Sequence, residues 1–332
     1  MSQIAFVWND VNYYWSTLVL CCALGAAILA LLGIRLLQGK LADAAVFLPL
    51  ALALGACGGR LQHWYCFYRQ YRDLEQAFTD FSVGGFCLTG AIVGVLLAAI
   101  LVRALFLTRD LPGLLDAAAA AGALGIAVGR LSAAFYSAAH GKNVFESETL
   151  HGLPFSTPLT NTAGGTDWRS AVFFWESIVT FLIFLAVLAV ILSGLLSKEK
   201  KPGGRAFWLF LILYGGFEIL FDSMRYDSAF FRSNGFVSVL QVFGLGCVFA
   251  AAVRFSVRGI RYGGFERKYP VCWTLLLAGG GLMGYMEYYV QRHGDLYVFS
   301  YLIMFLGLCA CLGAALTLLH AGSLADPVEQ GI

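Results

Sequence analysis

Nine stretches of about 20 or more mostly apolar residues follow one another along this 332-residue chain, and they constrain its fold more than any other feature. A helix needs roughly 20 apolar residues to cross the hydrocarbon core of a bilayer. Hydrophobic residues make up 59% of the sequence and charged residues only 13%, against roughly 25% charged in soluble domains. The sequence therefore predicts an all-α, polytopic integral membrane protein with spans near 13–38, 42–67, 82–108, 112–138, 170–196, 206–226, 235–257, 271–291 and 297–320.

The connections between these stretches differ in positive charge. One set, at 35–40, 103–109, 198–205 and 254–268, is richer in Lys and Arg than the other. Because such connections stay in the cytoplasm, we expect the N-terminus outside and the C-terminus inside. No basic residue precedes Arg35, so we expect the first stretch to remain a span rather than to act as a cleaved signal peptide.

Several other classes of protein are disfavoured by the same sequence. No basic cluster interleaved with aromatic residues occurs, which argues against nucleic-acid binding. The nine cysteines lie mostly inside apolar stretches, without a CxxC or a zinc-like Cys/His spacing, so we expect no metal site. No internal repeat is visible, which disfavours a transporter. Gly90-xxx-Gly94 and Gly280-xxx-Gly284 are interpreted as helix-packing positions.

Two connections on the expected outer side are longer than simple turns. Residues 139–169 form a long polar loop, and residues 68–81 have the composition of a short amphipathic segment at the membrane surface. Connections of this length in a compact bundle are often functional. The sequence therefore predicts that a functional site lies at the outer face.

Seven charged residues interrupt the apolar stretches, all toward their expected outer ends: Arg60, Arg130, Glu176, Glu218, Asp222, Arg225 and Glu287. Such a charge costs roughly 2.5–3.5 kcal/mol at mid-membrane and normally faces a partner inside the bundle. Among three tyrosines at 285–289, Glu287 is interpreted as an interfacial anchor.

Glu218, Asp222 and Arg225 have the i, i+4, i+7 spacing that places residues on one helix face. The two acids need a positive partner opposite, and Arg130 and Arg60 are the candidates. Two interpretations stay open at this point. One is an ion-pair network that only holds helices together, and the other is an electropositive pocket for a lipid phosphate, which suits the planar donors of arginine.

Several short motifs occur in a fixed order. They are Tyr14-Trp15, GACGGRL at 55–61, GFCLTGAIVG at 85–94, GRL at 129–131 with Gly141-Lys142 behind it, RSAVFFWES at 169–177, YGGFEILFDSMRYD at 214–227 and GFVSVLQVFGL at 235–245. This order resembles the phosphatidylglycerol–prolipoprotein diacylglyceryl transferases over about residues 10–258.

The resemblance implies a seven-helix transferase-like membrane core at 1–258 with an extracytoplasmic head at about 139–169. Residues 259–332 are then an extension with two further membrane helices and a short cytoplasmic tail. The implied activity is transfer of a diacylglyceryl group from phosphatidylglycerol to the lipobox cysteine thiol of prolipoproteins. It takes place at the outer face of the bacterial cytoplasmic (inner) membrane and needs no cofactor.

The resemblance also implies roles for individual residues. Arg130 is expected to hold the departing phosphate as a catalytic residue. The lipid headgroup is expected to contact Arg60, Arg130, Arg225, Tyr14 and Tyr214. The proton of the thiol is expected to pass to a nearby acid or base, for which the candidates are Glu176, Asp222, His63 and the loop histidines His140 and His151.

Four positions depart from the family pattern. Leu88 stands where the family has a histidine, Ala133 where it has an asparagine, and Ala138 where it has a glutamate. Glu218 stands where the family has an arginine, which reverses the charge. The alternative function is therefore a catalytically altered or inactive homologue that binds a lipid or a partner protein with the same fold.

Overall fold

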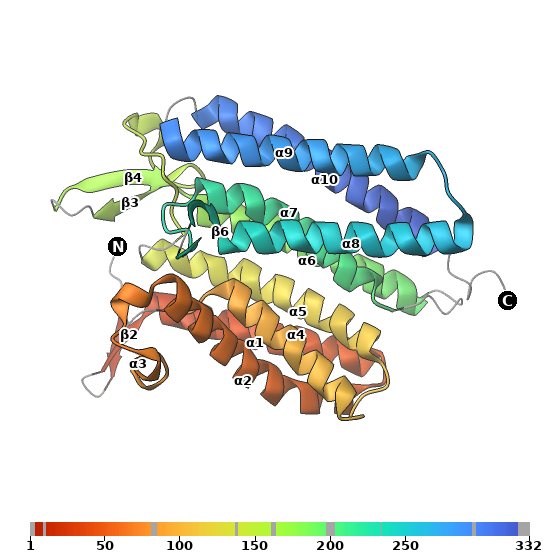
Figure 1. Cartoon of the computed structure of the whole chain (residues 1–332). Helices are drawn as coiled ribbons and strands as arrows, with labels where there is room; N and C mark the ends of the chain where they lie inside the picture. Colours follow the sequence, from red (N-terminus) through yellow and green to blue (C-terminus); the bar gives the residue numbers. More distant parts are fainter. Residues whose placement is uncertain are drawn as a thin grey trace.

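The computed structural model describes residues 4–8, 11–80, 85–136, 139–160, 164–196, 203–232, 234–293 and 297–324. Long helices run side by side along one direction, and the short strands gather at one end of the bundle (Figure 1). The long helices are α1 (Trp15–Leu37), α2 (Leu41–Cys66), α4 (Leu88–Ala104), α5 (Leu111–Arg130), α6 (Val172–Leu196), α7 (Arg205–Met224), α8 (Val239–Gly263), α9 (Lys268–His293) and α10 (Tyr297–Leu324).

Short elements connect these helices at the strand-bearing end. They are the helix α3 (Leu74–Thr79), the 3₁₀ helices η1 (Tyr68–Gln70), η2 (Leu131–Phe135) and η3 (Glu148–Leu150), and the strands β1 (Ile4–Trp8), β2 (Val11–Tyr14), β3 (Ser156–Thr160), β4 (Thr166–Ser170), β5 (Phe230–Phe231) and β6 (Asn234–Ser238). Among the described residues the strands form three antiparallel pairs, β1 with β2, β3 with β4 and β5 with β6.

Seven of the described helices are long and apolar enough to cross a membrane, namely α1, α2, α5, α6, α7, α8 and α10. This confirms the prediction of a polytopic, mostly helical membrane protein. Within the described part of the predicted stretch 82–108, the helix covers only the 17 residues of α4, because residues 85–87 are not helical and the chain turns after Ala104. The predicted stretch 271–291 forms the 26-residue α9, which is less apolar because it carries glycines, tyrosines and charges.

Helix α5 is the central element that joins two groups of helices (Figure 1). It packs on α1 on one side and on α6 and α7 on the other, while α2 packs on α4 and α9 on α10. Alanines on α5 make this possible, since Ala117, Ala120, Ala123 and Ala127 are all buried. Small side chains let helix backbones approach closely in a bilayer, where burial of apolar surface drives little association.

The α2–α4 crossing depends on glycine. A Cβ atom on Gly90 would collide with the backbone of Gly58, and a Cβ atom on Gly94 would collide with the backbone of Leu54. The packing role predicted for Gly90 and Gly94 is therefore confirmed.

The packing role predicted for Gly280 and Gly284 is not found. A Cβ atom on Gly284 would meet no atom of another element within 4 Å, and one on Gly280 would meet only Leu245, at 3.9 Å. The close approach of α9 to α10 occurs instead between Gly279 and Gly307.

The described part of the 139–169 loop lies against the ends of α6 and α7. The N–H of Gly141 donates to the carbonyl of Ser170 at 2.8 Å, and the N–H of Lys142 donates to the carbonyl of Met224 at 2.8 Å. Gly141 also forms an isolated antiparallel bridge with Arg225. These bonds position the loop directly beside the charged residues that end α5 and α7.

Candidate functional site

Three helix ends meet at the strand-bearing end of the bundle. Helix α5 ends at Arg130, α7 ends at Met224, and α6 begins at Val172, so Glu176 lies near its first turn. The three helices pack on one another, which places these ends together (Figure 1). Charges that are far apart in sequence therefore share one buried region.

Glu176 lies between two guanidinium groups. Its Oε2 is 3.0 Å from Nε of Arg130, and its Oε1 is 3.5 Å from Nη1 of Arg225. The Glu176 side chain is fully buried, while the side chains of Arg130 and Arg225 are 14% and 11% exposed. A buried carboxylate is tolerated when opposite charges stand on either side of it. Glu176 thus fixes both arginines relative to α6.

Arg225 has a second carboxylate partner in Asp227. Arg225 Nε lies 3.1 Å from Oδ1 and Nη2 lies 3.3 Å from Oδ2, so the pair is bidentate. The N–H of Ala139 donates to Oδ2 of Asp227 at 2.9 Å. Burial acts to raise the pKa of the Asp227 carboxyl, but the Arg225 charge and the Ala139 N–H outweigh it, and the pKa is lowered. Asp227 therefore ties the start of the 139–169 loop to Arg225.

Helix α7 contributes two further acids on one face. Glu218 is 1% exposed, and its Oε1 lies 3.6 Å from Nη2 of Arg130. Asp222, one turn later, is 3% exposed. Tyr214, one turn before Glu218, is buried, and its hydroxyl lies beside the Glu218 carboxylate. The predicted shared face of Glu218 and Asp222 is confirmed, whereas Arg225 lies just beyond the helix end.

The cluster contains more acid than base. Its members are the cations Arg130 and Arg225 and the carboxylates Glu176, Glu218, Asp222 and Asp227. Of the two interpretations left open by the sequence, the geometry favours an ion-pair network over an electropositive pocket. An anion that reaches Arg130 must compete there with Glu176 and Glu218.

A pocket of about 350 Å³ opens beside Arg130 between α1 and α5. Its walls are small or apolar: Leu20, Ala23, Leu24 and Ala27 of α1, and Gly122, Gly125, Ile126 and Gly129 of α5. Leu88 and Ala133 also line it. The two family positions that have lost a polar side chain therefore lie in the wall beside Arg130. Ala138, the third such position, lies outside the described residues.

Arg60 is predicted to contact a lipid headgroup, and the structure places it elsewhere than the cluster. It is 1% exposed, and its guanidinium donates to the carbonyls of Ala77, Asp80 and Gly85. It also lies over the ring of Tyr71, 5.3 Å from the ring centroid. Arg60 therefore binds the main chain of the 68–85 connection, at Ala77, Asp80 and Gly85.

His63 belongs to the same region as Arg60. The N–H of Gly85 donates to Nε2 at 3.2 Å, and Nδ1 lies 2.7 Å from the hydroxyl of Tyr71. With Nε2 as acceptor, neutral His63 carries its proton on Nδ1 and donates it to Tyr71. Both ring nitrogens are thus engaged away from Arg130.

The remaining predicted residues are spread over the same end of the bundle. Tyr14 occupies the N-cap position of α1 without a capping side-chain hydrogen bond, and it is exposed. His140 is buried with its ring 5.3 Å from that of Phe173, so it is not a surface residue. His151 stacks on Trp168 at 4.3 Å between ring centroids, and its Nε2 lies 3.1 Å from the carbonyl of Phe145.

Two residues that the sequence analysis did not assign to the site lie at its edge. The Nζ of Lys142 is buried and has no hydrogen-bond partner among the described residues, and it interacts electrostatically with Asp222 and Glu287. Burial lowers the pKa of Lys142, while the two carboxylates oppose this. Glu287 is 4% exposed and accepts from Nε2 of Gln291 at 2.8 Å, so the interpretation of it as an interfacial anchor is wrong.

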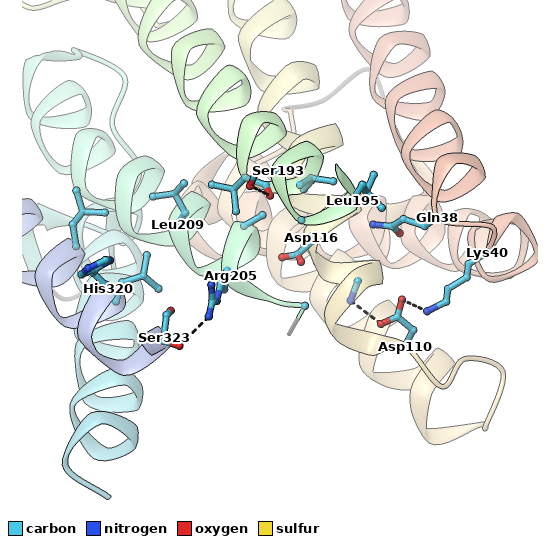
Figure 2. Close-up of a pocket in the computed structure, with 18 residues that line it drawn as sticks. Gln38, Lys40, Asp110, Asp116, Ser193, Leu195, Arg205, Leu209, His320 and Ser323 are labelled. Atoms are coloured by element: carbon cyan, nitrogen blue, oxygen red, sulfur yellow. Dashed lines mark hydrogen bonds and ion pairs between the residues drawn. The ribbon is translucent and has the colours of Figure 1, made fainter. Parts of the chain in front are cut away.

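A larger cavity, of about 850 Å³, lies at the opposite end of the bundle. Figure 2 shows Lys40 beside Asp110 and Arg205 beside Ser323 in its wall. Nζ of Lys40 lies 2.8 Å from Oδ2 of Asp110, and Nη2 of Arg205 donates to the carbonyl of Ser323 at 2.9 Å. Asp116 accepts from the N–H groups of Gly204 and Phe207, both at 2.7 Å, and so caps the N-terminus of α7. The polar side chains Lys40, Asp110 and Asp116 of this cavity are thus engaged in structural contacts.

Comparison with known proteins identifies what this arrangement resembles. The model of the prolipoprotein diacylglyceryl transferase family matches residues 3–257, about three quarters of the chain. The phosphatidylglycerol–prolipoprotein diacylglyceryl transferase of Geobacter sulfurreducens is 29% identical over 205 residues, which is 59% of this chain and 69% of that protein. The same enzyme of Clostridium botulinum strain Langeland is 26% identical over 249 residues, 74% of this chain and 93% of that protein. The family match ends before α9 begins.

Proposed function

The chain belongs to the prolipoprotein diacylglyceryl transferase family, and we propose that it moves a diacylglyceryl group from phosphatidylglycerol or a related phospholipid onto a lipobox cysteine of a prolipoprotein. The observation that carries this proposal is the position of Arg130. It stands at the polar end of an apolar pocket, inside a multi-pass membrane protein. A phospholipid needs this combination of apolar wall and single cation.

The pocket suits one acyl chain and the phosphate above it. Leucine, isoleucine, alanine and glycine residues of α1 and α5 form the apolar wall. The guanidinium of Arg130 uses Nε and Nη2 in its ion pairs with Glu176 and Glu218. The same guanidinium is the donor that we assign to a phosphate oxygen.

The reaction needs a thiolate and a stabilised leaving group. The cysteine sulfur attacks the glyceryl carbon that carries the phosphate, a C–S bond forms, and the C–O bond to the phosphate breaks. The electron pair of that bond stays on the phosphate oxygen, and glycerol phosphate leaves when the donor is phosphatidylglycerol. Arg130 faces the charge that develops on this oxygen, which is where a fixed cation accelerates the step.

The proton of the thiol must pass to a base, because a free cysteine thiol has a pKa of about 8.5. We propose that a carboxylate of the cluster accepts it, with Glu176 and Asp222 as the candidates named by the family pattern. Glu218 adds a third carboxylate beside Arg130. His63, whose two ring nitrogens are engaged by Tyr71 and Gly85, is the weaker candidate for this step.

We further propose that the strand-bearing end faces the outside of a bacterial cytoplasmic membrane, with the N-terminus outside and the C-terminus in the cytoplasm. The bias of Lys and Arg toward the other set of connections supports this orientation. A lipobox cysteine reaches the outer leaflet after export, which is the side on which Arg130 then lies.

The test is a two-substrate assay with the purified full chain. Phosphatidylglycerol vesicles and a lipobox peptide are expected to yield a thioether-linked diacylglyceryl peptide, detected by its mass, together with glycerol phosphate. Arg130→Ala is expected to abolish the product, while Arg69→Ala, an exposed arginine at the same end, is expected to retain it. Absence of product from the wild-type chain with every phospholipid tested would overturn the proposal.

The second candidate is a homologue that binds a lipid without transferring it. It is favoured by Leu88 and Ala133, which leave the pocket wall beside Arg130 without a histidine or an asparagine. This candidate predicts that the chain retains a phospholipid through purification and that Arg130→Ala loses it, with no thioether product in either case. Mass spectrometry of the co-purified lipid distinguishes the two.

A further inference from the structure

Two cysteines meet where α2 ends and α4 begins. Cys66 is the last residue of α2, and Cys87 occupies the N-cap position of α4. Their side chains share a hydrogen bond, so the two sulfur atoms lie within hydrogen-bonding distance of each other. Both cysteines are free thiols and both are half-buried, so a small reagent can reach them. The proposed transferase reaction uses neither of them.

The main chain that leads into α4 is bound to the last turns of α2. The N–H of Cys87 donates to the carbonyl of Gly59 at 3.0 Å. The N–H of Gly85 donates to Nε2 of His63 at 3.2 Å, and Nη1 of Arg60 donates to the carbonyl of Gly85 at 3.0 Å. A disulfide requires two main chains that are held close together. These three hydrogen bonds hold the start of α4 against α2, and the contact between the thiols is therefore part of the fold.

A positive charge lies beside one of the two thiols. Nε of Arg232 donates to the carbonyl of Tyr65 at 2.6 Å, and the Arg232 charge acts on the thiol of the next residue, Cys66. A neighbouring cation favours the thiolate, which is the form of cysteine that attacks a disulfide. Cys66 is therefore placed as the attacking sulfur, and Cys87 as the second sulfur that completes the bond.

We propose that Cys66 and Cys87 are a modification site, at which an external disulfide oxidises the two thiols to an intrachain disulfide. The Cys66 thiolate attacks one sulfur of the external disulfide, which gives a mixed disulfide and releases a first thiol. The Cys87 sulfur then attacks the Cys66 sulfur, the intrachain S–S bond forms, and a second thiol leaves. The chain gives up two electrons and two protons, and both protons end on the two released thiols.

This inference goes beyond the proposed function and does not need the transferase reaction. It agrees with the orientation proposed above, because disulfides persist in the oxidising compartment outside the cytoplasmic membrane. The bond also has a structural consequence. Leu88, the residue after Cys87, lines the pocket beside Arg130. A bond between Cys66 and Cys87 ties the start of α4 to α2, and it fixes this part of the pocket wall.

The experiment uses the purified full chain in detergent. One sample is treated with oxidised glutathione and another with dithiothreitol. Free thiols are then blocked with N-ethylmaleimide, the protein is digested with trypsin, and the peptides are identified by mass. Trypsin cuts after arginine, so residues 61–69 and 73–103 form separate peptides that each contain one cysteine. The two peptides are expected to be joined in the oxidised sample and separate in the reduced sample.

Three variants test the pairing. Cys66→Ser and Cys87→Ser are each expected to abolish the joined peptide. Cys57→Ser is the control, because Cys57 is an exposed cysteine on the same helix as Cys66, and this variant is expected to retain the joined peptide.

Thermal unfolding provides a second measurement. The disulfide restricts the unfolded chain between residues 66 and 87, so the unfolding midpoint of oxidised wild type is expected to lie about 5 °C or more above that of reduced wild type. The midpoints of Cys66→Ser and Cys87→Ser are expected to be the same in oxidising and reducing buffer.

Two outcomes overturn the inference. One is recovery of peptides 61–69 and 73–103 from the oxidised sample only as separate peptides, with free or singly glutathionylated cysteines. The other is a joined peptide together with a lowered unfolding midpoint, which would show that the bond strains the fold. Neither outcome bears on the transferase function, which is tested by the thioether product.

Discussion

Arg130 at the end of α5 and Glu176 at the start of α6 form an ion pair, with Nε 3.0 Å from Oε2, in a region where Glu176 has no exposure to solvent. Glu176 also faces Arg225, so one carboxylate holds an arginine at the end of α5 and another just beyond the end of α7. A fixed guanidinium needs no reorganisation when charge develops near it, which is the property an enzyme requires of a catalytic cation.

The first prediction concerns this pair. Glu176→Gln keeps the size of the side chain but removes the charge between Arg130 and Arg225. We expect the rate of thioether formation to fall roughly 100-fold, the scale of a misplaced catalytic group. The measurement is the initial rate in the two-substrate assay, with the midpoint of thermal unfolding as a check on folding. A variant that unfolds at the wild-type temperature and retains the wild-type rate would contradict this role.

The second prediction separates two roles for Arg60. If Arg60 holds the main chain of the 68–85 connection, Arg60→Ala leaves the carbonyls of Ala77, Asp80 and Gly85 without their donor. We expect a loss of about 2–4 kcal/mol in the free energy of unfolding, from buried acceptors that cost roughly 1–3 kcal/mol each. Arg60→Lys, which keeps the charge but not the planar fork, is expected to recover only part of it.

The measurement for Arg60 is thermal unfolding in detergent, followed by circular dichroism, beside the amount of phospholipid that co-purifies. A headgroup role gives the opposite pattern, in which bound lipid is lost and the unfolding temperature is unchanged. The structural role changes the unfolding temperature, and the headgroup role changes the amount of bound lipid. Arg60→Ala and Arg60→Lys therefore decide between the two roles.

The sequence was sufficient to name Arg130, beside Arg60, as a candidate partner of Glu218, and the ion pair between Arg130 and Glu218 confirms this. The pair of Arg130 with Glu176 was not predicted, although the position of Glu176 pointed to the same end of the bundle. Each of these charges interrupts an apolar stretch, and each lies toward the same end of its stretch. An unpaired charge in a bilayer is costly, so charges at one depth are expected to find one another. The predicted spans have the same basis, since long apolar stretches have few alternatives to a membrane helix.

The sequence was not sufficient to predict the partners of Arg60 or the burial of Glu287. Arg60 binds backbone carbonyls, which every residue carries and which therefore leave no sequence signal. Glu287 stands among tyrosines, as an interfacial residue would, and its burial depends on how α9 packs. The acid excess around Arg130 also depends on Asp227, which lies only two residues beyond Arg225 but joins the cluster through a turn of the chain.

The third prediction concerns the α2–α4 crossing. Gly94→Ala adds a Cβ atom that collides with the backbone of Leu54, and a backbone cannot move aside as a flexible side chain can. We expect a clear fall in the yield of folded protein and in its unfolding temperature. Overpacking of a core lowers the free energy of unfolding by about 1–3 kcal/mol. Gly25→Ala is the control, since a Cβ atom added to this helical glycine would meet no atom of another element within 4 Å.

Folded yield is measured by size-exclusion chromatography in detergent. Gly25→Ala is expected to match or slightly exceed wild type, because alanine has a higher helix propensity than glycine. Equal behaviour of the two variants would show that α2 and α4 do not cross at Gly94.

The fourth prediction is a pH dependence from Asp227, which lies beyond the end of α7. The pKa of its carboxyl is lowered in the folded chain: burial opposes this, but the Arg225 charge and the Ala139 N–H outweigh burial. A carboxyl with a lowered folded pKa adds stability that is fully present above its unfolded pKa of about 3.9 and is lost as pH falls through the folded value. The unfolding temperature of wild type is therefore expected to fall as the pH is lowered below about 4.

Asp227→Asn removes this titration while retaining an oxygen acceptor for the N–H of Ala139. We expect it to be less stable than wild type at pH 7 by about 1–2 kcal/mol, the size of a lost hydrogen bond to a charged group. We expect the difference to shrink as the pH falls from 5 toward 3, because protonation removes the same charge from wild type. The measurement is the unfolding midpoint of both proteins across this range. A difference that stays constant with pH would mean that Asp227 contributes through its shape and not through its charge.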